Sequence, residues 1–342
     1  MTQANTGPEA NDQTGIPPRA STDTHDFAPF IRILGRGPGR SRSMTRAEAR
    51  LALGMVLRGE ATSEQVGAML MLLRYRGEAA DEIVGLVEAA RDHAGLPWRF
   101  SRPVDLDWPS YADGRTRGLP WYLLAALLVA RSGIRVMMHG PAVGPGRQAL
   151  IETLGGLSIP PSTTEAAADH SLAALGFAFV PTEALSPEIA ALLALRGVLG
   201  LRSPLNTVGR LLDPANAIGS IDGVFHPAYI ALHLAVAERL DRQIAVLKGG
   251  GGEAEWTGVK PLVLNSRMGE AVWPALEVVG KPTSVSPADL VAVWQGSRAD
   301  PAAEAIVIAT SAVALFAAGR AYDPAACVVQ ARALWESRTV NP

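Results

Sequence analysis

The stretch IRVMMHGPAVGPGRQALIETLGG, residues 134–156, carries the pattern that decides the fold class. Residues 134–140 form a short, mainly apolar run that predicts a β-strand, and residues 146–156 predict a helix. The loop between them is rich in glycine and proline, as connections are. A strand that leads through a short loop into a helix is the repeating unit of α/β proteins.

The same alternation continues on both sides of this stretch. Strands are predicted at residues 103–108, 177–181, 243–249 and 261–265. Helices are predicted around them, at residues 119–133, 186–200, 226–240, 286–296 and 301–319. Strands that are separated by helices indicate a mostly parallel central sheet with helical cover.

A purely helical block precedes this region. Two capping boxes, Thr45 with Glu48 and Thr62 with Gln65, mark helix starts. Three short helices are predicted, at residues 45–59, 63–77 and 80–95. We therefore expect a disordered polar tail at residues 1–26, an N-terminal helical bundle at 27–100 and a larger α/β domain at 101–342.

Composition narrows the class of protein. Of the 342 residues, 48% are hydrophobic, which is typical of a globular protein. The single cysteine, Cys327, excludes an internal disulfide framework and favours a reducing, cytoplasmic location. The first 26 residues contain no apolar stretch like that of a signal peptide. The apolar run from Ala305 to Gly319 is shorter than the roughly 20 residues needed to cross a bilayer, so no membrane partner is expected.

Basic residues are concentrated near the N-terminus although the net charge is only −2. Within this segment only Glu48 opposes them. A local excess of arginine of this kind is a candidate phosphate-binding surface. The cluster consists of Arg32, Arg36, Arg40, Arg42, Arg46, Arg50 and Arg58.

Ligands of parallel sheets bind at the carboxyl ends of the strands. Three predicted loops follow strands there, at residues 107–118, 139–147 and 248–258. The first has few glycines and contains a proline, so it is a poor backbone cradle for phosphate. Its Arg115 and Arg117 could still bind phosphate through their side chains, or could be ordinary surface arginines.

The second and third loops are better candidates for an anion site. Arg147 stands where a helix is predicted to begin, and a helix N-terminus attracts anions. His139 and Gly140 precede it, although a lone histidine at a strand end is usually structural. In the third loop, Lys248 is followed by four glycines that could offer up to five backbone N–H donors, beginning with Gly249 and Gly250.

The third loop also contains two carboxylates, Glu253 and Glu255. Two carboxylates could bind Mg²⁺ together with substrate phosphates. The loop's own residues do not decide between phosphate and metal. No Walker A, GxSxG, HExxH or CxxC pattern occurs in the chain.

Three segments resemble the anthranilate phosphoribosyltransferase-like proteins of glycosyltransferase family 3. They are residues 57–89, residues 135–155 and above all LALRGVLGLRSPLNTVGRLLDPANA, residues 193–217. The resemblance covers about residue 28 to the C-terminus. It implies the nucleoside phosphorylase/phosphoribosyltransferase class of fold, with Arg196 near the aromatic acid of the enzymes. Arg202 and Asn206 match the family's signature arginine and asparagine.

The chain departs from the enzymes at three places. The enzymes have a GTGGD diphosphate loop where this chain has DWPSYAD, residues 107–113. A lysine and an asparagine flank their HG pair, and Met138 and Pro141 occupy these positions here. Their adjacent Asp-Glu pair for Mg²⁺ is replaced by GGGGEAEW, residues 249–256. The resemblance therefore implies a degraded phosphoribosyl diphosphate site.

Similar losses are found in the YbiB-type branch of the family, which implies a homodimer that binds nucleic acid without sequence preference. On this reading no cofactor is needed, and phosphates contact Arg36, Arg40, Arg42, Arg115, Arg117 and Lys248. Single-stranded nucleic acid is the expected partner, since Trp108, Tyr111 and Trp256 could stack on its bases, although each could instead be a core residue. The alternatives are an active phosphoribosyltransferase that uses phosphoribosyl diphosphate and Mg²⁺, and an interaction protein without catalysis.

Overall fold

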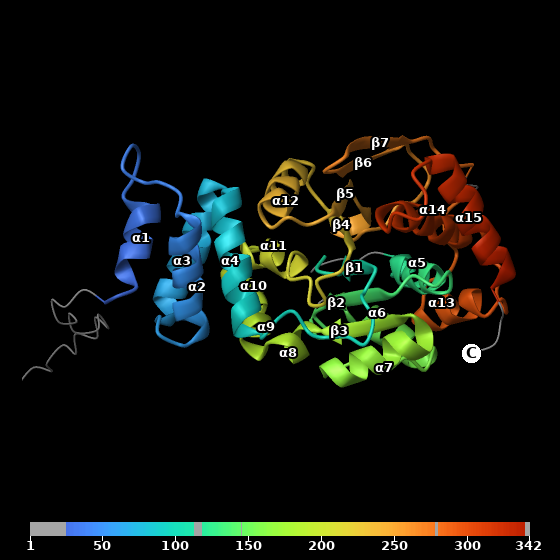
Figure 1. Cartoon of the computed structure of the whole chain (residues 1–342), viewed down its shortest axis with the longest axis horizontal. Coiled ribbons are helices and arrows are strands. Elements are labelled where there is room, and N and C mark those ends of the chain that lie inside the picture. The colour runs from blue at the N-terminus through green and yellow to red at the C-terminus, as the bar shows by residue number, and fades with distance from the viewer. Residues whose placement is uncertain (1–24, 113–117, 145, 278–279, 339–342) are drawn as a thin grey trace, which may run out of the picture.

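The computed structural model describes residues 25–112, 118–144, 146–277 and 280–338. Its N-terminal part is a bundle of four helices (Figure 1). These are α1 (Ala28–Gly35), α2 (Arg46–Leu57), α3 (Ser63–Arg76) and α4 (Ala80–His93). Both predicted capping boxes are present, at the starts of α2 and α3. The first helix, α1, was not predicted. The expected tail falls almost entirely outside the described residues.

The remainder of the chain builds one seven-stranded sheet in the order β3-β2-β1-β4-β5-β6-β7. The first five strands in this order are parallel, and the last two pair antiparallel. The prediction of a mostly parallel sheet is therefore confirmed. The strands are β1 (Leu106–Pro109), β2 (Val136–Gly140), β3 (Phe177–Pro181), β4 (Gly219–Val224), β5 (Ile244–Lys248), β6 (Leu262–Ser266) and β7 (Gly269–Trp273).

Helices cover the sheet on both sides (Figure 1). All ten residues of α5 are buried, which explains its uninterrupted apolar sequence. No helix within the described residues is both long and apolar enough to cross a membrane. The helices are α5 (Trp121–Ala130), α6 (Gln148–Gly156), α7 (Glu165–Leu175), α8 (Thr182–Leu185), α9 (Pro187–Ala194), α10 (Arg196–Leu199), α11 (Leu205–Arg210), α12 (Ala228–Arg239), α13 (Pro287–Trp294), α14 (Pro301–Ala317) and α15 (Pro324–Ser337), with a 3₁₀ turn η1 (Gly250–Gly252).

Bundle and sheet share part of one hydrophobic core. Leu53 and Leu86 of the bundle belong to the same buried cluster as Val180 of β3 and Val246 of β5. Helix α4 faces the sheet domain through α11 and α12, whereas α1 packs on α3 at the outer side of the bundle (Figure 1). The bundle is thus fixed against the carboxyl half of the sheet, and α1 is remote from it.

Candidate functional site

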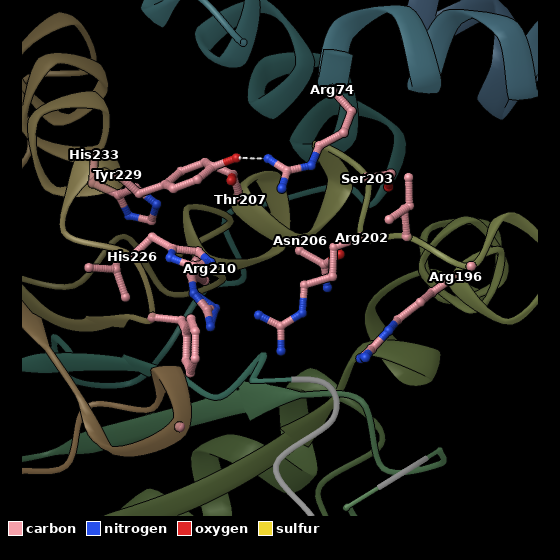
Figure 2. A pocket seen from close by; sticks show the side chains of 15 residues that line it. Arg74, Arg196, Arg202, Ser203, Asn206, Thr207, Arg210, His226, Tyr229 and His233 are labelled. Carbon is pink, nitrogen blue, oxygen red and sulfur yellow. Dashed lines mark hydrogen bonds between the residues drawn. The ribbon is translucent and has the colours of Figure 1, made fainter.

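An open cleft of about 610 Å³ lies where the bundle meets the carboxyl edge of the sheet. Its walls come from the end of α3, the segment from α10 to α11, the end of β4, α12 and η1. We call it the arginine cleft (Figure 2). The side chains that define it are Arg74, Arg196, Arg202, Asn206, Arg210 and Phe225.

The lining of this cleft is cationic. Four arginines and two histidines line it, and the described part of its wall contains no aspartate or glutamate. Figure 2 shows Arg196, Arg202 and Arg210 extending into the same space. Arg210 is held in place because its Nη2 donates to the backbone oxygen of Gly252 at 2.9 Å and its Nε lies 3.5 Å from Asp222 Oδ1. Gathered guanidinium groups favour a ligand that carries negative charge.

A glycine shapes the segment that carries two of these arginines. Helix α10 ends at Gly200, whose φ of 69° lies in the left-handed region that disfavours a side chain. The chain turns there, and α11 begins after Pro204. As a result the three residues that the family resemblance singles out, Arg196, Arg202 and Asn206, line one cleft.

A contact between bundle and sheet domain forms one wall of the cleft. Arg74 at the end of α3 donates a hydrogen bond to the Tyr229 hydroxyl of α12 (Figure 2). That hydroxyl lies 3.4 Å from Glu78 Oε2, to which it donates. Burial raises the pKa of both Tyr229 and Glu78. The sequence analysis missed Arg74 and Tyr229, because no local pattern joins residues that lie so far apart in the chain.

The glycine run is not the open phosphate cradle that the sequence predicted. The N–H of Gly249 donates to the Val224 oxygen, that of Gly250 to the Glu255 oxygen and that of Gly252 to the Gly249 oxygen. These donors are therefore already used inside the protein. Lys248, which precedes the run, is exposed at the end of β5 but does not line the arginine cleft.

Close packing explains why glycines are needed in this loop. A Cβ atom on Gly249 would lie 1.6 Å from the Glu253 oxygen, and one on Gly223 of β4 would lie 2.1 Å from the Glu253 carbonyl carbon. No neighbour can yield by that much, since the opposing atoms are backbone. The glycines let the end of β5 fold back against β4.

The carboxylate of Glu253 points into the protein. It accepts a hydrogen bond from the Ala112 N–H at 2.9 Å and lies 3.5 Å from Arg147 Nη2. Arg147 in turn donates to Ser110 Oγ at 2.9 Å. Arg147 is 3% exposed and Glu253 is 2% exposed. Loops that follow β1, β2 and β5 are thus joined by a buried ion pair. We call Ser110, Ala112, Arg147 and Glu253 the self-paired cluster.

This arrangement does not fit a magnesium ion. Glu255 accepts from the Tyr122 N–H of α5 at 3.1 Å, whereas Glu253 accepts from Ala112 in the loop after β1, so the two glutamates bond to different elements. The guanidinium of Arg147 already neutralises Glu253. Nowhere in the described chain do three or more His, Cys, Asp or Glu side chains gather as a metal site would require. Magnesium needs about six oxygen ligands in near-octahedral geometry, which this donor set does not offer.

His139 is also buried inside the protein. Its Nδ1 lies 3.0 Å from the Tyr111 hydroxyl, and its Nε2 lies 3.1 Å from Asp107 Oδ1. Gly140 follows it because a Cβ there would lie 2.1 Å from the Ser110 oxygen. His139, Gly140 and Arg147 were predicted to face an anion, but their polar groups point to protein atoms instead. Burial raises the pKa of Tyr111.

The N-terminal arginines fall into two groups. Arg42, Arg46, Arg50 and Arg58 pair with Glu48, Glu88, Asp92 and Glu60. The hydrogen bond from Arg42 lowers the pKa of Glu48 to about 2. Glu48 is the one acid within the segment, but the fold brings Glu88 and Asp92 of α4 to Arg46 and Arg50, and Glu60 pairs with Arg58. Arg32, Arg36 and Arg40 are exposed, and no acidic partner for them is found among the described residues.

The remaining residues that were predicted to contact nucleic acid are two arginines and three aromatic residues. Arg115 and Arg117 lie outside the described residues. Trp108, Tyr111 and Trp256 are at most 5% exposed, so they are core residues and not base-stacking platforms. The exposed aromatic residue of the cleft is Phe225, which follows β4. It was missed because β4, with the sequence GSIDGV, has too many glycines and polar residues to be recognised as a strand.

The chain is similar to known proteins in sequence and in fold. Residues 28–94 match the model of the glycosyl transferase family helical bundle domain. An anthranilate phosphoribosyltransferase of Beijerinckia indica is 30% identical over 69% of this chain and 67% of its own length. The YbiB protein of Escherichia coli is 30% identical over 67% of this chain and 72% of its own.

Solved structures give the same assignment. The anthranilate phosphoribosyltransferase of Thermus thermophilus superposes with a TM-score of 0.74 and 26% identity, covering 92% of this chain and 95% of its own. The similarity thus extends over both the bundle and the sheet domain. This chain belongs to the glycosyltransferase family 3 proteins related to anthranilate phosphoribosyltransferase.

Proposed function

We propose that this protein binds nucleic acid without sequence preference, and that its phosphoribosyl diphosphate site is degraded. One observation carries the proposal: four arginines line an open cleft whose described wall contains no carboxylate. Phosphodiester groups are the anions that such a surface suits, because guanidinium groups bind phosphate oxygens in a bidentate manner. Contacts of this kind give affinity but no sequence information.

The state of the three strand-end loops supports the second half of the proposal. A bound diphosphate with Mg²⁺ needs free backbone donors and free carboxylates. Here the N–H groups of Gly249, Gly250 and Gly252 donate to backbone oxygens of the protein, and the guanidinium of Arg147 lies 3.5 Å from Glu253. Removing Arg147 from this contact would leave a buried, unpaired carboxylate, which is unfavourable. The loops are therefore stable as they are, without ligand.

The competing function is that of an active phosphoribosyltransferase. Two observations support it. The chain is 30% identical in sequence to an anthranilate phosphoribosyltransferase, and Arg196, Arg202 and Asn206 line one cleft. Calorimetric titration with phosphoribosyl diphosphate and Mg²⁺ separates the two functions. We expect no saturable binding and no transfer to anthranilate. Turnover that disappears in Arg196→Ala would contradict the proposal.

Salt dependence tests nucleic-acid binding itself. Affinity for a homopolymeric single strand should fall linearly on a plot of log affinity against log salt, with about −0.7 in slope for each phosphate contacted. Arg202→Ala should flatten the slope by about that amount and weaken all sequences alike. Arg50→Ala is the matched control, because Arg50 lies on the bundle and pairs with Asp92. Absence of binding at low salt, or binding indifferent to salt, would refute the proposal.

We further propose that the protein is a homodimer and acts in the cytoplasm, as the family resemblance and the single cysteine suggest. Sedimentation equilibrium tests the dimer, and a monomer at all concentrations would exclude it.

A further inference from the structure

An exposed aromatic ring lies in the arginine cleft. Phe225 is 53% exposed, and it is the one phenylalanine of the described chain that is exposed. It lines the cleft together with Arg196, Arg202 and Arg210. Its neighbour His226 contacts it edge-on, with ring centroids 4.7 Å apart. A single exposed apolar side chain is common on protein surfaces, so what points to a role in binding is the place of this ring in the lining of an open cleft that also contains guanidinium groups.

The backbone that carries Phe225 is fixed from both sides. Val224 precedes it, pairs with Lys248 in the sheet and accepts a hydrogen bond from the Gly249 N–H at 3.1 Å. On the other side Gly252 comes so close that a Cβ there would lie 3.3 Å from the Phe225 Cβ. The tight glycine loop thus supports the position of the ring. The fixed backbone adds no ordering cost when a ligand binds, and a phenylalanine side chain with two torsions loses little conformational entropy.

A ligand for this arrangement must present a flat face and negative charge together. An unpaired nucleotide does so, with its base on the ring and its phosphate near the guanidinium groups. A duplex does not, because its base faces are covered by neighbouring bases. The cleft of about 610 Å³ is also of a size that takes a small group, not a double helix.

We infer that Phe225 is the stacking platform for one unpaired base, and that it gives the protein a preference for single strands. This inference rests on the proposed nucleic-acid binding and adds to it the form of nucleic acid that the cleft takes. The arginines supply affinity for any phosphate backbone. The ring supplies the discrimination between single strand and duplex.

The experiment compares a thymidine homopolymer with a duplex of equal length, using fluorescence anisotropy at several salt concentrations. Phe225→Ala should weaken single-strand binding about 5- to 150-fold, which is the loss of one base stack. Duplex binding and the salt slope should not change, since no phosphate contact is lost. Phe225→Trp should retain single-strand affinity. Tyr322→Ala, which removes a 68% exposed ring outside the cleft, is the matched control.

The outcomes separate this inference from the function on which it rests. If Phe225→Ala weakens single strand and duplex equally, or neither, the stacking role is wrong while salt-dependent binding of the wild type still supports the proposed function. If the wild type binds no nucleic acid at low salt, both are wrong. A circular dichroism spectrum and an unfolding curve like those of the wild type establish that the variant is folded.

Discussion

The arginine cleft and the self-paired cluster lie at the same carboxyl edge of one sheet, yet their arginines have opposite environments. In the cluster, Arg147 is 3% exposed and faces Glu253 and Ser110. In the cleft, Arg196 and Arg202 are half-buried in a wall that has no carboxylate among its described residues. Both regions contain the residue type that binds phosphate. What distinguishes them is the set of described residues around each arginine: Glu253 faces Arg147 in the cluster, whereas the described residues that line the cleft include no aspartate or glutamate.

The strongest test of this contrast is to break the buried pair. Arg147→Ala leaves Glu253 buried without a counter-charge, so we expect the free energy of unfolding to fall by about 3–5 kcal/mol. Glu253→Ala should have a similar effect, because it also removes the acceptor of the Ala112 N–H. The double variant should lose less than the sum of the single ones. Urea unfolding followed by circular dichroism measures all three.

An exposed pair of the same chemistry provides the control. Arg46 pairs with Glu88 on the surface of the bundle, and its side chain is 50% exposed. Arg46→Ala should change the unfolding free energy by no more than about 1 kcal/mol. Equal losses in Arg147→Ala and Arg46→Ala would mean that the cluster is not the internally neutralised unit described above.

A second test uses a buried carboxyl outside the cluster, Asp213, which lies 3.7 Å from the Arg242 guanidinium. Burial, with the charge of Asp107 as the next cause, raises the pKa of Asp213 from 3.8 to about 6. The folded state then holds a proton between about pH 4 and pH 6 that the unfolded chain releases. This contribution to stability is complete below about pH 4 and is lost as pH rises through about 6. About two units at about 1.4 kcal/mol each give a loss of about 3 kcal/mol.

Asp213→Asn isolates this contribution. The asparagine keeps an oxygen for the Ala217 N–H, which Asp213 Oδ1 accepts at 2.9 Å, but it does not titrate. The difference in unfolding free energy between wild type and variant should therefore vary between about pH 4 and pH 6 and be constant above about pH 7. An Asp213→Asn difference that is constant across this range would show that the group is not shifted.

Sequence patterns predicted the architecture, but they did not predict which polar groups of the strand-end loops are bonded to other parts of the protein. Periodicity and capping boxes gave the bundle and four of the five parallel strands, because these signals are local. Strand β4 escaped because Gly219 and Gly223 are set by contacts with Ala317 and Glu253, far away in the chain. Whether an arginine such as Arg147 is buried also depends on residues far away in the chain. The sequence therefore could not distinguish this buried arginine from the exposed ones. The glycine run looked like a phosphate cradle since tight packing and anion binding both call for glycine.

The smallest expected effect concerns two arginines of the bundle for which the described residues provide no acidic partner. Arg36 and Arg40 are exposed beside α1, which lies on the far side of the bundle from the cleft (Figure 1). A short oligonucleotide held in the cleft should not reach them, whereas a long one should. Arg36→Ala with Arg40→Ala should therefore leave the binding of a short thymidine oligonucleotide unchanged. For a long strand it should flatten the slope of log affinity against log salt by about 1.4, two contacts at about 0.7 each.

Arg46→Ala with Arg50→Ala is the matched control and should flatten the slope less, because Glu88 and Asp92 already bind those guanidinium groups. Equal slopes for the two double variants on the long strand would mean that pairing with acids does not decide which arginines bind phosphate.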